Sequence, residues 1–452
     1  MATMAPPVPR QAPPTYADVN RDIIRTLDPP GKGWFLGMGV IFLGLLIGGV
    51  SWAIQLKDGI GVTGYTPPVF WGTYITTFVF WVGIAHSGTL ISAVLYLFRS
   101  GWRAAVYRAA EAMTVFAVMT AGLFPVLHLG RAWFAYWVAP YPNIRGLWAN
   151  FRSPLVWDIF AISTYLTVSA TFLLMGLIPD VAALRDQATG WRRRLYALVS
   201  FGWRNSDGEW RHFMRMYLFL AALSTPLVLS VHSVVSWDFA MAIVPGWHAT
   251  IFAPYFVAGA IFSGCGMVIT ILVPLRKAFH LERYITVRHF ENLAKLCLLT
   301  STIVGYAYFT EYFIAWYSGN PIERASFYSR AFGDYWWATW TMIVCNVFIP
   351  LFLWSKRIRT NITWLFVISI FINIGMWFER FVIIVSSLAH EFEPWQWAYY
   401  TPNHIEIGVI IGSFSWFSMW FMLFIKFFPA LAIAEVKEAL PPPGRTHAGG
   451  PH

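Results

Sequence analysis

Long apolar stretches alternate with short polar segments along almost the whole chain. A helix that crosses the hydrocarbon core of a bilayer needs about 20 mostly apolar residues. Ten stretches meet this requirement, at residues 33–56, 68–98, 104–128, 155–179, 213–237, 250–275, 290–318, 335–355, 361–388 and 405–430. The pattern predicts an all-α polytopic membrane protein with about ten transmembrane helices.

Positive charge is distributed unevenly between the connecting segments. Most arginines and lysines fall in segments that an even number of spans separates from the N-terminus, such as Arg192 to Arg194. The alternate segments hold fewer, together with the acidic stretch from Glu391 to Glu393. Because basic residues are retained on the cytoplasmic side, we expect a multi-pass protein of the cell inner membrane with both termini cytoplasmic. We also expect the first apolar run to be a span rather than a cleaved signal peptide.

Composition agrees with a bilayer environment. Of the 452 residues 57% are hydrophobic and 12% are charged, whereas soluble domains carry about 25% charged residues. The net charge of +10 comes from the loops, so we expect lipid and no nucleic acid as a partner. Cys265, Cys297 and Cys345 lie in apolar stretches without a CxxC pair, which argues against a disulfide framework, a zinc site or iron–sulfur ligands.

The second and sixth predicted spans resemble each other. In "FVFWVGIAHSGTLISAVLYLF" and "YFVAGAIFSGCGMVITILVPL", Ser87-Gly88 matches Ser263-Gly264. This weak echo favours two four-helix bundles with one flanking helix at each end. The predicted units are an irregular cytoplasmic N-terminal tail (1–32), a first flanking helix and outer loop (33–67), a first bundle (68–249), a second bundle (250–404), a last flanking helix (405–430) and an irregular cytoplasmic C-terminal tail (431–452).

Two outer loops are rich in aromatic residues and proline, "RAWFAYWVAPYPNIRGLWANFRSP" and "HEFEPWQWAYYTPNH". Tryptophan and tyrosine form belts at membrane–water interfaces. The same loops could also form a platform for a docked outer subunit, and the sequence leaves both interpretations open.

Ionisable side chains within spans are costly, and each is a functional hypothesis. His128 ends the third span, and Asp158 lies one turn into the fourth, so we expect both just inside the outer interface on neighbouring helices. Either group can accept a hydrogen bond or a proton from a hydroquinone hydroxyl. The alternative is structural: an interfacial histidine, and an acid that the helix dipole favours.

His86 lies near the middle of the second span, where it could relay protons, ligate a haem or bond a neighbouring helix. We find no second histidine at a matching depth for a haem. Pairing His128 with His232 as haem ligands is a further alternative. Asp238 follows just beyond the fifth span.

The second half contains Glu311 in the seventh span and Glu379-Arg380 in the ninth. Adjacent helical residues point about 100° apart, so we expect Glu379 and Arg380 to pair with other helices, and Glu311 to pair with Arg380. These groups are either a buried structural ion pair or part of a proton path. The sequence contains no Walker loop, dinucleotide fingerprint or HExxH motif.

Together, the ten-span pattern, "HSGTLISAVLYLFR", "FPVLHLGRAWFAYWVAPYPN", "FRSPLVWD" and "MWFERFVI" resemble the NrfD-like family of polysulfide reductase membrane subunits. The likeness extends over residues 33–430 and is closest to the ActC subunit of bacterial alternative complex III. The resemblance implies quinol, with menaquinol expected, bound by His128 and Asp158 with Arg131 as a helper.

The resemblance also implies partners. Electrons would pass to a [3Fe-4S] cluster in a periplasmic iron–sulfur subunit and then to c-type cytochrome subunits, beside a second NrfD-like membrane subunit. No haem or cluster would be bound by this chain. Proton transfer would involve His86, Asp238, Glu311, Glu379 and Arg380. The second half lacks a His/Asp pair like that of the first, so we expect one quinol site.

Three alternatives remain at this point. The chain could be a proton-coupled secondary transporter with Glu311, Glu379 and His86 as coupling residues, because glycines and prolines could interrupt its helices near the midplane. It could be a purely structural anchor for redox subunits. It could also serve a polysulfide- or sulfoxide-type reductase, because other subunits choose the electron acceptor.

Overall fold

The computed structural model describes residues 14–138, 153–438 and 440. Within them, ten helices are long and apolar enough to cross a membrane, which confirms the predicted all-α polytopic fold. Single helices form the spans α2 (Lys32–Asp58), α3 (Thr73–Leu97), α6 (Pro154–Arg185), α8 (Asp207–Ala240), α9 (Phe252–Ala278), α10 (Val287–Tyr317) and α17 (His404–Phe427). Consecutive segments form the others: α4 (Tyr107–Ala121) with α5 (Phe124–His128), and α15 (Ile362–Phe381) through α16 (Ser387–Ala389). The remaining span begins with α12 (Trp336–Ile343) and continues to Trp354.

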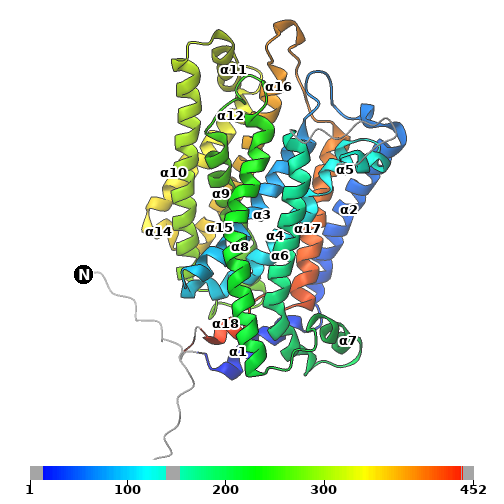
Figure 1. Cartoon of the computed structure of the whole chain (residues 1–452), viewed down its shortest axis with the longest axis vertical. Helices are drawn as coiled ribbons and strands as arrows, with labels where there is room; N and C mark the ends of the chain where they lie inside the picture. Colours follow the sequence, from blue (N-terminus) through cyan, green and yellow to red (C-terminus); the bar gives the residue numbers. More distant parts are fainter. Residues whose placement is uncertain (1–13, 139–152, 439, 441–452) are drawn as a thin grey trace, which may run out of the picture.

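Short helices cover the two ends of this bundle (Figure 1). The end that carries α1 (Tyr16–Ile24), α7 (Gly190–Val199) and α18 (Ile433–Glu438) is called the terminal end. The opposite end, with α11 (Pro321–Phe332) and the segments before α3 and α17, is called the loop end. The short α13 (Ile349–Leu351) and α14 (Lys356–Arg359) follow α12.

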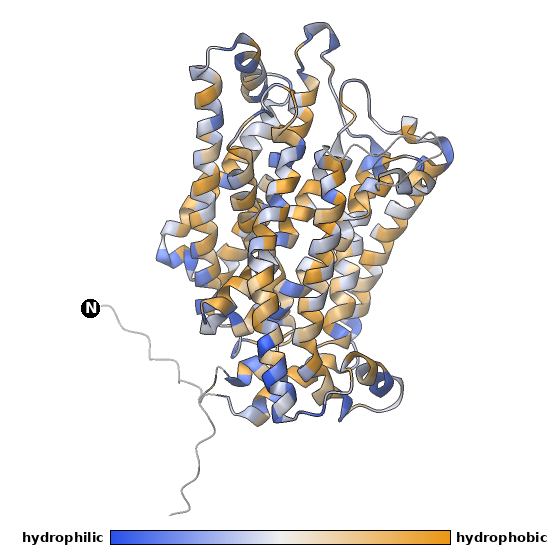
Figure 2. Ribbon diagram, viewed as in Figure 1, coloured by the Kyte–Doolittle hydropathy of each residue, from blue (hydrophilic) through white to orange (hydrophobic). Residues whose placement is uncertain are grey.

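The long helices follow from the lack of water in a bilayer, since a helix satisfies every backbone polar group internally. Apolar residues predominate along the middle of the helices, and polar ones gather toward the two ends (Figure 2). On α2, Phe35, Leu36 and Val40 are exposed, which is the arrangement expected of a helix that faces lipid.

Small residues bring α2 and α17 into close contact. A Cβ atom added at Gly48 would lie 2.5 Å from the Cα atom of Gly412, and one added at Gly408 would overlap the Ser51 hydroxyl. Small residues of this kind let transmembrane backbones approach closely. The two flanking helices of the sequence prediction therefore pack against each other along their length.

The echo in the sequence lies at the contact between α3 and α9. A Cβ atom at Gly264 would overlap the Ser87 hydroxyl, and one at Gly83 would lie 3.5 Å from Ser263 Oγ. Ser87 of the first motif therefore packs against Gly264 of the second, whereas Gly88 faces Ala110 and Thr114 of α4. The division into two bundles remains a prediction.

The expectation of irregular tails is wrong where the structure describes them. Thr15 caps α1, and its hydroxyl accepts a hydrogen bond from the Asp18 backbone N–H at 3.2 Å. Lys426 donates to the carbonyls of Thr26 and Asp28. Amphipathic helices this short bury too few apolar residues to be read from hydropathy. Residues 1–13, 439 and 441–452 lie outside the described residues.

The aromatic loops are described in part. Residues 139–152, which include Arg145 and Arg152, lie outside the described residues. In the second loop Trp395 and Tyr399 are exposed. Both interpretations of these loops, the interfacial belt and the docking platform, remain predictions.

Candidate functional site

Two carboxyl groups face each other at the loop end. Asp158 lies one turn into α6, which starts at Pro154, and Asp238 lies near the end of α8. Their side chains are close enough for a protonated carboxyl to hydrogen-bond to the other, and Oδ1 of each is buried without a partner. Two carboxylates at this separation repel, so the arrangement is most stable with one shared proton.

His128 ends α5 at the same end of the molecule. Its ring packs edge-on against Tyr65, with 5.7 Å between ring centroids, and its Nδ1 atom is buried without a partner. The Tyr65 hydroxyl accepts a hydrogen bond from the Tyr74 backbone N–H at 3.2 Å. His128 therefore has an unused ring nitrogen within a well-defined aromatic environment.

A polar network supports the side of His128 that faces α2. The Gln55 side chain, fully buried, donates from Nε2 to the Leu127 carbonyl at 2.7 Å. Its Oε1 accepts from the Tyr74 hydroxyl at 2.6 Å. These two bonds fix the last turn of α5 and therefore the position of His128.

Glu406, at the start of α17, organises the loop before α3. The carboxylate accepts hydrogen bonds from the Gly64 backbone N–H at 2.8 Å, from the Thr73 hydroxyl at 2.9 Å and from the Tyr400 hydroxyl. Burial, with the nearby Tyr400 and Glu406, raises the pKa of Tyr65 well above its usual value. Burial and Glu406 likewise raise the pKa of Tyr400. Both phenols therefore remain protonated.

The sequence analysis missed this network. Glu406 is the fourth residue of a capping box that starts at Asn403, a pattern that marks a helix start and draws no further attention to the carboxylate. Gln55 lies near the end of the first span, and an uncharged polar side chain inside a span is the signal that could have found it.

The predicted pair of His128 and Asp158 is brought to the same end of the molecule, on helices that follow each other in the chain. Within the described residues, however, Asp158 contacts Asp238 and His128 contacts Tyr65. Arg131 is exposed, one residue after Gly130, whose φ is +71°. Their joint action on one ligand remains a prediction.

His86 and His232 lie against each other in the middle of the molecule, with ring centroids 4.4 Å apart. The expectation that His86 has no second histidine at its depth is therefore wrong. The cause is the length of α8, which places His232 deeper than the predicted span implied. His86 Nδ1 lies 2.6 Å from the Val82 carbonyl, and its ring stacks on Tyr165 at 4.7 Å. His232 contacts His86 and Phe256, and no contact with His128 is found among the described residues.

Glu379 and Arg380 form an ion pair with each other. The expectation that they pair with other helices rather than with each other is wrong for this ion pair, because the long arginine side chain can fold back across the helix surface. Glu379 also accepts a hydrogen bond from the Tyr308 hydroxyl, which in turn accepts one from Asn346 at 2.9 Å. The positive charge of Arg380 also acts on His232.

Glu311 does not pair with Arg380 as expected. Its nearest opposite charge is Arg330 of α11, which donates to Ser387 and lies over the Phe327 ring at 4.5 Å. Glu311 lines a small cavity of about 50 Å³ at the loop end. The ion pair was mispredicted because α11 was not among the predicted helices.

Buried ion pairs fill the terminal end. Arg108 Nη2 lies 2.9 Å from Asp180 Oδ2, and Arg103 lies 2.6 Å from Glu435 on α18. The Asp180 carboxylate also accepts from the Ala434 backbone N–H at 3.1 Å. Arg103 directly precedes the third predicted span and Arg108 lies near its start, and the sequence analysis identified no partner for either; Arg108 is only 1% exposed.

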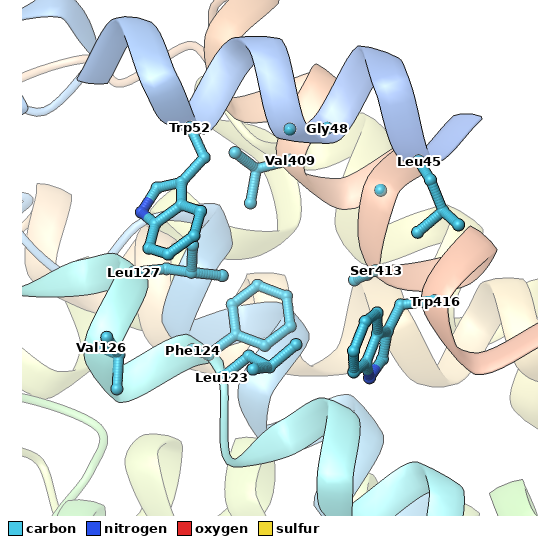
Figure 3. Close-up of a pocket in the computed structure, with 12 residues that line it drawn as sticks. Leu45, Gly48, Trp52, Leu123, Phe124, Val126, Leu127, Val409, Ser413 and Trp416 are labelled. Carbon is cyan, nitrogen blue, oxygen red and sulfur yellow. The ribbon is translucent and has the colours of Figure 1, made fainter. Parts of the chain in front are cut away.

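An apolar cleft of about 390 Å³ separates the α2–α17 pair from α5 (Figure 3). Trp52 and Trp416 extend into it from opposite sides, and Phe124 and Leu127 form its floor. The cleft opens to the surface at Gly49 and Leu123, both of which are exposed. Gln55 does not line the cleft but follows Trp52 by about one turn of α2, and His128 follows the lining residue Leu127 directly.

Comparisons with known proteins identify the family of this chain. The family model "Polysulphide reductase, NrfD" matches residues 61–390, a range that contains His128, Asp158 and Asp238. The chain is 30% identical over 266 residues to a "Putative dimethyl sulfoxide reductase membrane subunit" of Halobacterium salinarum, covering 58% of this chain and 56% of that relative. It is 23% identical over 406 residues to a selenate reductase subunit of Mesobacillus selenatarsenatis, covering 82% of this chain and 90% of that relative. The chain thus spans little more than half the length of the first of these relatives.

Proposed function

Because the chain belongs to the NrfD family of polysulphide reductase membrane subunits, we propose that it binds quinol at the loop end and oxidises it within a membrane-bound oxidoreductase. The observation that carries the proposal is a set of three buried acid–base atoms at that end, on α5, α6 and α8, that have no hydrogen-bond partner within the part of the chain that the structure describes. They are His128 Nδ1, Asp158 Oδ1 and Asp238 Oδ1. Buried polar atoms normally have partners, so such a set is suited to a polar ligand.

Quinol oxidation releases two electrons and two protons and leaves a quinone. In this proposal, the His128 ring accepts one hydroxyl proton, and the Asp158–Asp238 pair accepts the other. A positioned acid–base group contributes about 10²–10⁴-fold to such a transfer. Tyr65 orients the His128 ring, and Arg131 assists at the exposed side.

The electrons pass to a partner subunit at the loop end, for which an iron–sulfur subunit with a [3Fe-4S] cluster is the proposed acceptor. The names of the two relatives favour a terminal reductase as the destination of the electrons, since one is a putative dimethyl sulfoxide reductase membrane subunit and the other a selenate reductase subunit. An alternative complex III, with c-type cytochromes and a second NrfD-like subunit, is the other destination. A c-type haem spectrum in the purified complex would distinguish the two.

The orientation follows from charge. The terminal end carries the segments rich in arginine, including Arg192 to Arg194 of α7, so we propose that it faces the cytoplasm. Protons from menaquinol would then leave on the outer side. His86, Asp238, Glu311, Glu379 and Arg380 are the groups proposed to carry any further proton transfer.

The test is quinol oxidation by the purified complex with His128→Ala and Asp158→Asn. Both variants should assemble and lose quinol-driven reduction of the partner subunit. Asp186→Asn is the matched control, since Asp186 is exposed at the terminal end beside Arg185. Normal oxidation by both variants would place the site elsewhere.

A further inference from the structure

We infer that the apolar cleft between α2, α17 and α5 holds the isoprenoid tail of the quinol and leads its ring to His128. This inference rests on the proposed function. The cleft lies between α5 and the α2–α17 pair and opens to the surface at Gly49 and Leu123, so it provides a route from the lipid toward the buried site.

The position of the cleft supports this assignment. Leu127 lines the cleft, and the next residue, His128, carries the unpartnered ring nitrogen. On the opposite wall Trp52 lies one turn before Gln55, whose amide holds the Leu127 carbonyl at 2.7 Å. An apolar chain in the cleft would therefore have its polar head group at the Gln55–Tyr65–His128 end.

The chemistry of the walls fits a long, flexible hydrocarbon. Leu45, Leu123, Val126 and Val409 supply aliphatic surface, and the rings of Trp52 and Trp416 face the cavity from α2 and α17 (Figure 3). Lipid tails are as apolar as these side chains, so the fit rather than the hydrophobic effect decides which chain occupies the cleft. An isoprenoid tail has the further advantage that its attached ring reaches the acid–base groups.

Gly49 offers a direct test because it lines the cleft and a Cβ atom added there meets nothing within 4 Å. A Phe at this position fills the cleft without disturbing the α2–α17 contact, which runs through Gly48. Gly39 is the matched control, because it lies on the same helix, is exposed and also has open space at its Cβ, but lies outside the cleft.

The experiment measures oxidation of two quinols by the purified complex, menaquinol with its isoprenoid tail and dimethylnaphthoquinol, which has the same kind of ring and no tail. We expect Gly49→Phe to raise KM for menaquinol about tenfold, equivalent to losing about 1.4 kcal/mol of binding. KM for the tail-less quinol should stay unchanged, and Gly39→Phe should change neither. Quinone that co-purifies with the complex, measured after solvent extraction, should fall in Gly49→Phe alone.

If Gly49→Phe does not assemble, Leu123→Trp fills the same cleft from the exposed side of α5 and is held to the same criteria. Equal changes for both quinols, or no change for either, would overturn the cleft assignment while leaving quinol oxidation in place. Loss of co-purifying phospholipid with normal menaquinol kinetics would assign the cleft to an acyl chain instead. Oxidation of neither quinol by the unmodified complex would defeat the proposed function and the cleft assignment together.

Discussion

Helix α6 carries two buried aspartates whose surroundings differ completely. Asp180, at the terminal end, lies 2.9 Å from the guanidinium of Arg108 and accepts a backbone hydrogen bond from Ala434. Asp158, at the loop end, faces the carboxyl of Asp238 and has an oxygen without a partner. A buried acid with a counter-charge and a full set of bonds stabilises the fold, whereas one facing another acid is retained for what it can bind or transfer.

The largest effect is expected at the paired aspartate. Asp180→Asn leaves Arg108 buried without its counter-charge, which costs about 3–5 kcal/mol in the free energy of unfolding. Unfolding of the purified complex in denaturing detergent measures this loss. The double variant Asp180→Leu, Arg108→Leu should recover much of it. The interpretation of Asp180 as structural would be wrong if Asp180→Asn were as stable as the unmodified protein but failed to oxidise quinol.

The second effect concerns the unpaired aspartate. Asp158→Asn should lower the turnover rate of quinol oxidation by about 100-fold, because a group that accepts a proton contributes at least that much. Stability should stay close to that of the unmodified protein, since the introduced amide can donate a hydrogen bond to the Asp238 carboxylate in place of the shared proton. A large loss of stability in Asp158→Asn would instead show that Asp158, like Asp180, stabilises the fold.

A smaller effect is expected at Tyr65, which holds the His128 ring. Tyr65→Phe keeps the ring contact but removes the hydroxyl that accepts a hydrogen bond from the Tyr74 backbone N–H. Losing this bond loosens the segment that positions the His128 ring, so quinol oxidation should fall by about fivefold, near 1 kcal/mol for one lost hydrogen bond. The raised pKa of Tyr65 has a sign that can be checked: the phenol stays protonated as the pH rises through 10, the usual tyrosine value. The ratio of unmodified to variant rates should therefore be constant up to that pH, and a ratio that collapses below it would contradict the assigned state.

The smallest effect is expected at Arg131, which is exposed. Exposed charges contribute about 0–1 kcal/mol, so Arg131→Gln should raise KM for quinol by no more than about fivefold, and added salt should reduce the difference. A loss as large as that of Asp158→Asn would show that Arg131 belongs to the centre of the site.

Hydropathy predicted the ten spans because a bilayer leaves few alternatives to apolar helices. Which polar side chains contact each other inside the bundle was harder to predict, because these contacts depend on where each helix ends and on its rotation about its own axis. The fifth span was predicted to end at residue 237, which left Asp238 outside it, whereas α8 continues to Ala240 and brings Asp238 against Asp158. The same difference in length placed His232 at the wrong depth for His86.

The roles of other residues could not be predicted from the sequence because they depend on tertiary contacts. Gln55 and Tyr65 are near neighbours in the sequence, but Tyr74 of α3 links them and Tyr400 connects Tyr65 to Glu406. These contacts form only once α2, α3 and α17 have packed. Arg108, near the start of the third predicted span, had no partner predicted from the sequence but is buried beside Asp180 in the fold. Sequence periodicity identifies what faces lipid, but it does not say which polar groups meet inside.

The most direct test of the central claim is photolabelling of the intact complex with an azidoquinone, followed by mass spectrometry of its peptides. The account predicts labels on segments containing Tyr65, His128 or Asp158, which unlabelled menaquinol prevents and which are weaker in His128→Ala. Labels displaced by menaquinol only around Glu311, at the other side of the loop end, would contradict the proposed site.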